Sequence, residues 1–360
     1  MRVAVDVTYA RGGQGRPMSG TGVYLQRLVP ALRRLGVDVV ELANLRRRPP
    51  GGGGLRSARN LLADTAWAQQ ELPRLAARAG ADVLHHPLPA RSRSTALAQT
   101  VTVMDLAFEA LPWAFDPAFR RWAAHAHRAA ARGADAVVTP SQATCHDVVT
   151  RWVVSPARVV VARLGPGQEP DATRPPDTPA HFLYVGDGEP RKNLGLLLEG
   201  YARYRAATEA DGGTQALPLV LAGSAAAAAA GVIVEHRPDP QRLARLYAGA
   251  AALVHPALHE GFGLTPLEAM SAGTPVVAVH SPAVAEVCDD AALYVGPRAA
   301  DDLAGHLQML GADARVRADL RLRGRRRAAE FSWARCATAH LRAYTLALRR
   351  RDGAQGRMKA

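Results

Sequence analysis

Short apolar runs alternate with helical patterns along most of this chain, and this alternation is the feature that most restricts its fold. Strands of a parallel sheet are buried on both faces and read as continuous apolar runs, while the helices that join them carry one apolar stripe. Residues 251–254 and 276–278 are two such runs, with a loop, a helix and a turn between them. The sequence therefore predicts an α/β protein built from parallel βαβ units.

The same alternation continues on both sides of a proline-rich stretch between residues 161 and 181, which is the best candidate for a linker. A length of 360 residues exceeds one ordinary core, so two sheets are expected. The expected strands are 3–7, 37–42, 83–85, 101–104, 136–138, 181–186 and 219–223. The expected helices are 58–79, 117–132, 194–204, 299–310, 314–330 and 333–349. A further helix is expected to begin at Ser19-Gly20-Thr21-Gly22 and to end at Gly36. Residues 49–54 are interpreted as a flexible break. The predicted domains are 1–165, a linker 166–180, a second domain 181–335, and a helix with a basic tail over 336–360.

The net charge of +13 is concentrated near the C-terminus. Residues 311–360 contain 14 Lys or Arg against 4 Asp or Glu, which leaves a net charge of only +3 for the first 310 residues. The arginines at 321–327 have few aromatic neighbours, unlike a surface on which single-stranded nucleic acid stacks, and no nucleic acid is expected as a partner. Peripheral contact with an anionic membrane stays open, with basic residues at 27, 33, 34 and 46–48 adding charge. A solvated basic face is the other interpretation.

The cysteines argue for a reducing compartment, because Cys145, Cys288 and Cys336 are odd in number and far apart. They are expected to be buried thiols and not ligands of a structural metal.

The N-terminal apolar stretch is too short for a signal peptide, and no stretch approaches the roughly 18 apolar residues of a membrane span. A cytoplasmic location is expected, with peripheral contact at the inner face of the membrane as an option.

Residues 260–270 place two carboxylates, Glu260 and Glu268, eight positions apart across a loop that leads into a helix. The residues that favour an open loop and a helix start are Gly261, Gly263, Thr265 (as a cap) and Pro266 (as the first helical position). Free amides at a helix N-terminus bind phosphate, and carboxylates accept hydrogen bonds from sugar hydroxyls. The segment therefore predicts a site for a nucleotide sugar, and the alternative is a capped amphipathic helix with solvated glutamates.

This segment resembles the retaining GT-B glycosyltransferases of family four, which carry the pattern E-G-F-G-L-x-x-L-E-A-M-A-x-G-x-P-V-V. The resemblance covers nearly the whole chain and is strongest from residue 182 onward. Its other segments are 20–35, 134–141, 190–194, 290–295 and 331–333. It implies a GT-B fold, in which two Rossmann-like, doubly wound parallel-sheet domains face each other across a cleft, with the last helix crossing back onto the first domain. It also favours the branch that builds surface polysaccharides, often with mannose or rhamnose.

Arg191 and Lys192 are adjacent cations at a predicted strand-to-helix turn. Such a pair is usually exposed, but a departing diphosphate needs its charge neutralised. In the resembled family the pattern P-R-K-N-L places this basic pair on the diphosphate, and no D-x-D metal motif is evident, so no metal and no cofactor are expected. Asp289-Asp290 and Asp301-Asp302 are interpreted as turn and helix-start residues.

The resemblance also assigns roles to the remaining candidate residues. It implies that Glu260 contacts the donor sugar near the reacting carbon, and Asp105 is counted with Glu260, Arg191 and Lys192 as catalytic. The expected donor-binding residues are Glu268 on the ribose, Gly20 and Gly22 on a phosphate, Gly263, Leu264, and Arg237 near the base.

One residue departs from the family pattern. Members commonly read His-Asp-Leu where this chain has Met104-Asp105-Leu106. A thioether cannot replace the hydrogen bond of a histidine, so three outcomes stay open: His85 or His86 compensates, the sugar lacks the hydroxyl concerned, or the activity is weak. His85 and His86 are themselves more typical of a structural pair.

The resemblance implies transfer of a hexosyl or deoxyhexosyl group from a nucleotide-diphosphate sugar to a hydroxyl acceptor with retention of configuration. GDP-mannose is the first expected donor, followed by dTDP- and UDP-sugars. Retention is expected without a protein nucleophile, so that catalysis is mostly positioning and electrostatics. The alternatives are a GT-B-like sugar-nucleotide epimerase or phosphorylase, and a basic module that binds membrane or nucleic acid.

Overall fold

The computed structural model describes residues 1–10, 19–46, 54–168, 178–210 and 215–359, with side chains left out at 54–58 and from 354 on. By its contacts the chain divides into two units, and each is described by itself. Unit 1 is Met1–Glu109, Asp116–Leu164 and Trp333–Ala360, and unit 2 is Ala110–Phe115 and Gly165–Ser332. The expected glycine loop after the first strand, the flexible break and most of the linker lie outside the described residues. The bounds of the four predicted segments stay predictions.

Unit 1 contains a six-stranded parallel sheet in the order β2-β1-β3-β4-β5-β6. Its strands are β1 (Arg2–Asp6), β2 (Asp38–Leu42), β3 (Val83–His86), β4 (Ala98–Thr102), β5 (Ala136–Thr139) and β6 (Val159–Val161). Strands β5 and β6 are nearly continuous apolar runs, as a sheet covered on both faces favours, whereas β3 and β4 also bury polar side chains, among them His85, His86 and Gln99. The chain runs from β1 outward to β2 and then back across β1 to β3, so the strand order reverses between β1 and β3.

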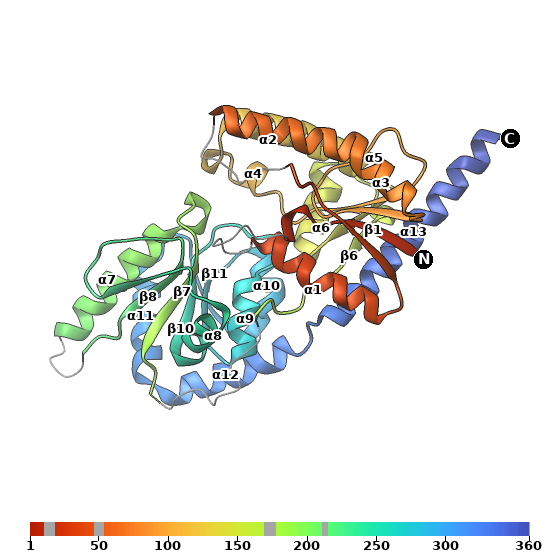
Figure 1. Ribbon diagram of the computed structural model, residues 1–360. Coiled ribbons are helices and arrows are strands. Elements are labelled where there is room, and N and C mark those ends of the chain that lie inside the picture. The colour runs from red at the N-terminus through yellow and green to blue at the C-terminus, as the bar shows by residue number, and fades with distance from the viewer. Residues whose placement is uncertain (11–18, 47–53, 169–177, 211–214, 360) are drawn as a thin grey trace. The chain divides into compact units, whose positions relative to one another are not determined.

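Helices cover both faces of this sheet (Figure 1). They are α1 (Gly20–Arg34), α2 (Gly54–Ala66), the π-helical turn η2 (Trp67–Glu71), α3 (Leu72–Arg78), α4 (Ala107–Ala110), α5 (Pro117–Gly133), α6 (Gln142–Arg151) and α13 (Trp333–Lys359). On one face Trp67 and Leu72 pack against Leu84 of β3. On the other face α13 packs against α1, β4, β5 and β6, so the last helix of the chain completes the core of the first sheet.

A buried polar network fixes α13 on this sheet. Tyr24 Oη of α1 lies 2.7 Å from His340 Nε2 and 3.0 Å from Thr102 Oγ1, and Tyr344 Oη lies 2.8 Å from His85 Nδ1. His85 Nε2 also lies 2.8 Å from Thr102 Oγ1. All five side chains are at most 1% exposed. Because each polar group finds a partner inside the network, α13 has one favoured position.

Unit 2 contains a second six-stranded parallel sheet in the order β12-β11-β10-β7-β8-β9. Its strands are β7 (His181–Gly186), β8 (Leu219–Gly223), β9 (Val232–His236), β10 (Ala250–His255), β11 (Val276–Val279) and β12 (Ala292–Val295). Its helices are α7 (Leu194–Ala210), α8 (Pro240–Gly249), α9 (Leu264–Ala272), α10 (Pro282–Cys288), α11 (Ala300–Ala312) and α12 (Ala314–Ala328). Helices α7 and α11 pack together on one face over Phe182, Tyr184 and Leu221. Helix α9 contacts both α8 and α10.

The two doubly wound parallel sheets confirm the predicted fold class. Several elements differ from the prediction. The strand expected at 101–104 is β4 and ends at Thr102, the helix expected at 58–79 contains the π-helical turn, and the helix from Leu194 continues to Ala210. The sequence did not lead us to predict α4, α6, α8, α10, β6, β9 and β12 as elements. Cys288 and Cys336 are buried, but Cys145 is only half-buried, contrary to the expectation that all three are buried.

Candidate active site

The candidate site of unit 2 lies where the strand order of its sheet reverses. Strand β7 is followed by β8 and β9 on one side, whereas β10, β11 and β12 lie on its other side. In doubly wound sheets, ligands bind outside the carboxyl ends of the strands at this reversal. The chain leaves β7 toward Arg191 and Lys192 and leaves β10 toward Glu260, so the sheet brings these three residues together.

Arg191 and Lys192 lie in a short 3-10 turn, η5 (Pro190–Lys192), between β7 and α7. Asn193 follows with a left-handed φ of 54°, and its side chain donates to the carbonyl of Pro297 at 3.0 Å. The backbone N–H of Leu258 donates to the carbonyl of Arg191 at 2.9 Å, which ties this turn to the loop that carries Glu260. The turn and the loop therefore form one local structure.

Three nitrogen atoms surround a single oxygen of Glu260. Its Oε1 lies 2.5 Å from Lys192 Nζ, 3.7 Å from Arg191 Nη1 and 3.6 Å from His255 Nε2. Arg191 Nε also donates to Glu189 at 2.7 Å. The side chains of Lys192, Arg191 and Glu260 are only 14–18% exposed, so these charges interact with little solvent screening.

The electrostatics follow from this burial and charge. Burial alone raises the pKa of Glu260, but Lys192, His255 and Arg191 together outweigh burial and lower that pKa to about 2. Burial also lowers the pKa of His255 to about 4, with Lys192 and Arg191 contributing and Glu260 opposing. At neutral pH the cluster is therefore a carboxylate between two cations and a neutral imidazole. His255 is a residue of this cluster that the sequence reading missed, because it ends a strand that reads as apolar.

Helix α9 begins directly after the Glu260 loop. Its N-cap is Gly263, with a φ of 109° that favours glycine, and Leu264 is its first residue. The expectation that Thr265 caps this helix and that Pro266 is its first residue is wrong, since both lie inside the first turn. The first amides of α9 are thus left without a side-chain cap at the place where Gly263 and Leu264 were predicted to bind the donor.

Glu268 lies one turn further along α9 and is half-buried. Its Oε2 accepts a hydrogen bond of 2.9 Å from the hydroxyl of Tyr247, a side chain that is 1% exposed. Burial, followed by the charge of Glu268, raises the pKa of Tyr247 well above its usual value, so this phenol remains a donor. Tyr247, also missed by the sequence reading, fixes the orientation of the carboxylate predicted to bind the ribose.

Arg237 follows β9 with a left-handed φ of 50°, and its N–H donates to the carbonyl of Gly223 at 3.0 Å. Gly223 ends β8, and a Cβ there would lie 2.2 Å from the carbonyl oxygen of Gly186. The carboxyl ends of β7 and β8 are therefore packed backbone against backbone. Strand β9 lies two strands from β7 in the sheet, and because all strands are parallel, Arg237 at its carboxyl end lies at the same edge of the sheet as Lys192.

Three predicted site residues belong to unit 1. Gly20 and Gly22 are in the first turn of α1, where Ser19 Oγ already accepts the Gly22 N–H at 3.2 Å. Asp105 lies after β4 and accepts the N–H of Ala107 at 2.8 Å, which starts α4. Met104, in the position of the family's histidine, is half-buried.

The two histidines considered as replacements for that residue are buried in unit 1. His85 is 0% exposed and bonded in the network that holds α13, so it does not replace the missing histidine. His86 is 1% exposed and its Nε2 lies 3.3 Å from Gln99 Oε1. It lines a cavity of about 50 Å³ at the carboxyl ends of β1 and β3, where the strand order of unit 1 reverses. Asp6 and Trp67 line the same cavity and hydrogen-bond each other at 3.0 Å.

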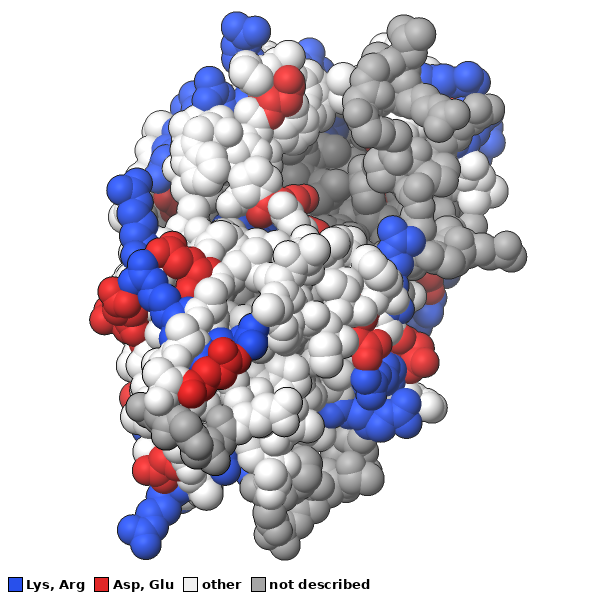
Figure 2. Space-filling view, turned by 90° about the vertical axis from the view of Figure 1, so that its left-hand side faces the viewer, with Lys and Arg blue, Asp and Glu red and all other residues white. Residues whose placement is uncertain are grey.

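Several arginines of the basic C-terminal region bind carbonyl groups inside unit 2. Arg327 donates to the carbonyls of Glu286 and Val287 at the end of α10, at 2.7 and 3.0 Å. Arg317 donates to those of Leu310 and Gly311 near the end of α11, at 2.8 and 3.2 Å. Cations at helix C-termini are stabilising. Figure 2 shows a face that is largely uncharged, on which several Lys and Arg side chains lie beside Asp or Glu. Arg317 and Arg327 thus serve the fold of unit 2.

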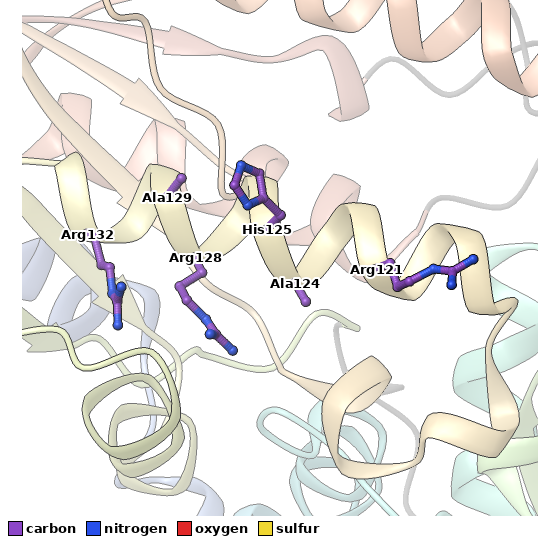
Figure 3. A pocket seen from close by; sticks show the side chains of 6 residues that line it. All are labelled: Arg121, Ala124, His125, Arg128, Ala129 and Arg132. Carbon is purple, nitrogen blue, oxygen red and sulfur yellow. The ribbon is translucent and has the colours of Figure 1, made fainter.

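Helix α5 carries four arginines, two histidines and no acidic residue. A hollow of about 540 Å³ lies along it. Figure 3 shows the six residues that line the hollow, with Arg128 and Arg132 extending from one side of the helix and His125 from the other. Arg128 pairs with Glu109 at 3.4 Å, and Arg132 donates to the carbonyl of Trp152 at 2.6 Å. Arg121 and His125 are exposed.

Among the described residues, no helix combines the length and apolarity needed to span a bilayer. Within the same ranges, no group of three or more His, Cys, Asp or Glu side chains is arranged to hold a metal ion.

The two parallel doubly wound sheets, each with a strand-order reversal, have the architecture of the GT-B fold. Solved structures with this fold include sucrose-phosphate synthase from Thermosynechococcus elongatus, with a TM-score of 0.73, 20% identity, and coverage of 96% of this chain and 98% of that one. WaaG, a glycosyltransferase involved in lipopolysaccharide biosynthesis, has a TM-score of 0.65 and 17% identity over 91% of this chain and 95% of that one.

Sequence comparison identifies the family. Residues 18–165 match the model of Glycosyltransferase Family 4, and residues 167–327 match that of Glycosyl transferases group 1. This protein belongs to the GT-B glycosyltransferases of family 4, also called group 1, as its motifs indicated.

Two curated relatives carry more specific names. O-antigen chain mannosyltransferase B of Escherichia coli is 35% identical over 180 residues, which is 46% of this chain and 46% of that protein. MMP alpha-(1->4)-mannosyltransferase of Mycolicibacterium hassiacum is 30% identical over 284 residues, which is 74% of this chain and 65% of that protein. The chain thus spans less than two thirds of the length of each.

Proposed function

We propose that this protein transfers a mannosyl group from a nucleotide-diphosphate sugar to a hydroxyl acceptor, with retention at the anomeric carbon. GDP-mannose is the first candidate donor, and dTDP- and UDP-sugars follow. The observation that carries the proposal is the pair Arg191 and Lys192 held beside Glu260 at the strand-order reversal of unit 2. The names of the two relatives support mannose as the sugar.

The proposed mechanism uses this cluster to stabilise the leaving group. As the anomeric bond breaks, negative charge develops on the diphosphate, and Arg191 and Lys192 neutralise it. Glu260 accepts hydrogen bonds from the sugar and holds it near the reacting carbon, while Glu268 accepts them from the ribose. The departing diphosphate takes the acceptor's proton on the same face, so the residues act by positioning and charge.

The acceptor is proposed to bind unit 1. The cavity beside Asp6 and His86 lies at the strand-order reversal of that sheet, which is the usual place for a ligand. Asp105, Gly20 and Gly22 stay proposed site residues of this unit, with Gly22 the weakest because Ser19 already accepts its amide. Since His85 is bonded elsewhere, three explanations for Met104 stay proposed: His86 compensates, the sugar lacks the hydroxyl concerned, or the activity is weak.

The test is a thermal-shift screen against GDP-, dTDP-, UDP- and ADP-sugars, followed by NMR of the product formed with a sugar acceptor. Stabilisation by one class of donor and an unchanged anomeric configuration are expected. Consumption of the donor without acceptor would instead favour an epimerase or a phosphorylase. Absence of binding by any donor at millimolar concentration would refute the proposal.

A cytoplasmic location, with contact at the inner face of the membrane, is part of the proposal. Helix α5 supports the contact, because Phe119 and Trp122 are 44% and 39% exposed on a helix without acidic residues. Such basic and aromatic surfaces bind anionic bilayers. Co-sedimentation with phosphatidylglycerol vesicles should fall in Trp122→Ser with Arg121→Glu, and phosphatidylcholine vesicles should bind neither protein. Equal binding of the variant would place the contact elsewhere.

A further inference from the structure

We propose that His255 is a positioning residue for Glu260: when a diphosphate draws Lys192 away, His255 donates the hydrogen bond that keeps the Glu260 carboxylate directed at the sugar. This inference rests on the proposed function, because it assigns a role within the same site. His255 lies outside the E-G-F-G-L pattern, which begins at Glu260.

The first observation is the geometry around Glu260 Oε1. Only Lys192 Nζ, at 2.5 Å, is within hydrogen-bond distance of this oxygen among the three nitrogens around it. His255 Nε2 lies 3.6 Å away, so a movement of less than an ångström by the carboxylate would bring it to the usual N–H to O distance of about 2.9 Å.

The second observation is that His255 Nε2 is free to donate a hydrogen bond. The side chain is 3% exposed, and this nitrogen is buried with no hydrogen-bond partner among the described residues. A neutral imidazole carries its proton on one of two nitrogens. A lone pair directed at a carboxylate would be repelled, so the favoured tautomer places N–H on Nε2, facing Glu260. Buried donors without partners are rare, and their cost is removed once a partner arrives.

The third observation is the competition for Lys192. Without donor, the two cations are matched by two carboxylates, Glu260 on Lys192 and Glu189 on Arg191. A diphosphate adds more negative charge than either carboxylate and must bind the same two cations. Lys192 then shares its N–H groups with phosphate oxygens, which weakens its hold on Glu260.

The fourth observation is the rigidity of the position. His255 is the last residue of β10, which lies between β7 and β11 in the middle of the sheet, and it pairs in register with Ala278. Its backbone cannot follow the moving lysine. The imidazole therefore remains a fixed point, toward which the Glu260 side chain turns when Lys192 binds phosphate.

The experiment compares His255→Leu, which removes the donor, with His255→Gln, whose amide N–H reaches a similar place. The probe for the diphosphate subsite is the free nucleoside diphosphate of the active donor, measured by calorimetry, because it has no sugar for Glu260 to hold. We expect His255→Leu to bind it within about 3-fold of the wild-type affinity while kcat falls roughly 10- to 100-fold, the usual effect of losing one hydrogen bond to a charged group. His255→Gln should recover most of kcat. His306→Leu on α11 is the matched control and should behave as wild type.

Two results would overturn the inference: an unchanged kcat in His255→Leu, or a parallel loss of thermal stability, diphosphate affinity and kcat that His255→Gln does not restore. The second result would mark His255 as part of the core only. Failure of the proposed function is distinguishable, because in that case the wild-type protein itself neither binds the nucleoside diphosphate nor transfers sugar, and both proposals would be wrong.

Discussion

Lys192 Nζ lies 2.5 Å from Oε1 of Glu260, although the two residues are 68 positions apart in the sequence. They meet because β7 and β10 are neighbours in the sheet of unit 2 and each is followed by a loop at the same edge. The pair holds a lysine in place before any ligand arrives. A preorganised cation stabilises developing negative charge without the cost of ordering it during the reaction.

Removal of either cation should abolish most of the transfer activity. We expect Lys192→Ala or Arg191→Ala to lower kcat/KM by roughly 100- to 1000-fold, as for loss of a preorganised donor, with the far-ultraviolet circular dichroism unchanged. Arg203→Ala on α7, which breaks exposed pairs with Glu199 and Asp301, is the control and should retain full activity. Near-normal turnover in either variant would remove these cations from the mechanism.

Glu268→Ala should act on donor binding. Loss of the carboxylate proposed for the ribose is expected to raise KM for the donor about 10-fold or more and to leave kcat within a few-fold. Tyr247→Phe should raise the same KM by a smaller factor, because Tyr247 only orients the carboxylate through its 2.9 Å hydrogen bond. Steady-state kinetics at saturating acceptor measure both. An unchanged KM in Glu268→Ala would place the ribose elsewhere.

The buried network of unit 1 should contribute measurably to stability. In Tyr24→Phe, His340 and Thr102 lose a partner inside the core, which should lower the free energy of unfolding by about 1–3 kcal/mol. Urea denaturation followed by tryptophan fluorescence measures this change. Thr338→Ala, on the exposed side of α13, is the control and should cost little. Equal stability of the two variants would mean that the network is not needed.

Stability should decrease as the pH falls below 6.5. Burial lowers the pKa of His86, His127 and His340 to about 4, so between pH 6.5 and 4 the unfolded chain binds protons that the folded protein does not. The contribution is fully present above pH 6.5 and is lost toward lower pH, by about 1 kcal/mol per histidine at pH 5.5. Denaturation at pH 7.5 and 5.5 measures this slope, and His127→Phe, which keeps an aromatic ring beside Phe108, should reduce it. A free energy of unfolding that is equal at both pH values would contradict the prediction.

Arg327 and Arg326 offer a direct test of how the basic region is used. Arg327→Ala removes hydrogen bonds to the end of α10 and a contact over Phe331 at 5.2 Å, and it should destabilise the protein by about 1–2 kcal/mol. Arg326 is exposed, and Arg326→Ala should change the melting temperature little. If the two variants melted at the same temperature, the arginines of this region would be surface charges only.

Much of the fold could be predicted from the sequence, because most of the buried strands contain an apolar run and α1 carries both its start and stop signals. Strand β9 is an edge strand whose residues are exposed or half-buried, and its short apolar run at 232–234 is a strand signal that could have revealed it. Helix α6 has little periodicity, although Ser141, which accepts the N–H of Thr144 at 3.0 Å, is a cap signal that could have revealed it. The start of α9 was misplaced because Gly263 caps it through backbone conformation alone.

The predicted site residues of unit 2 were found through local patterns, and their roles stay predictions. The sequence could not indicate His255 or Tyr247. Tyr247 contacts Glu268, which lies on the next helix, and His255 lies near Glu260 across the loop that follows β10. Each lies in a segment whose pattern predicts only core, and the local pattern does not show which carboxylate its side chain will face.

The position of α13 has a consequence for synthesis. Its side chains fill the core over β4, β5 and β6, so unit 1 remains incomplete until residues 333–349 have left the ribosome, whereas every strand of unit 2 is already available. Domains usually mature in the order in which they are translated. Here the later half of the polypeptide can reach its final state first, and the earlier half must wait, partly covered, for its last helix.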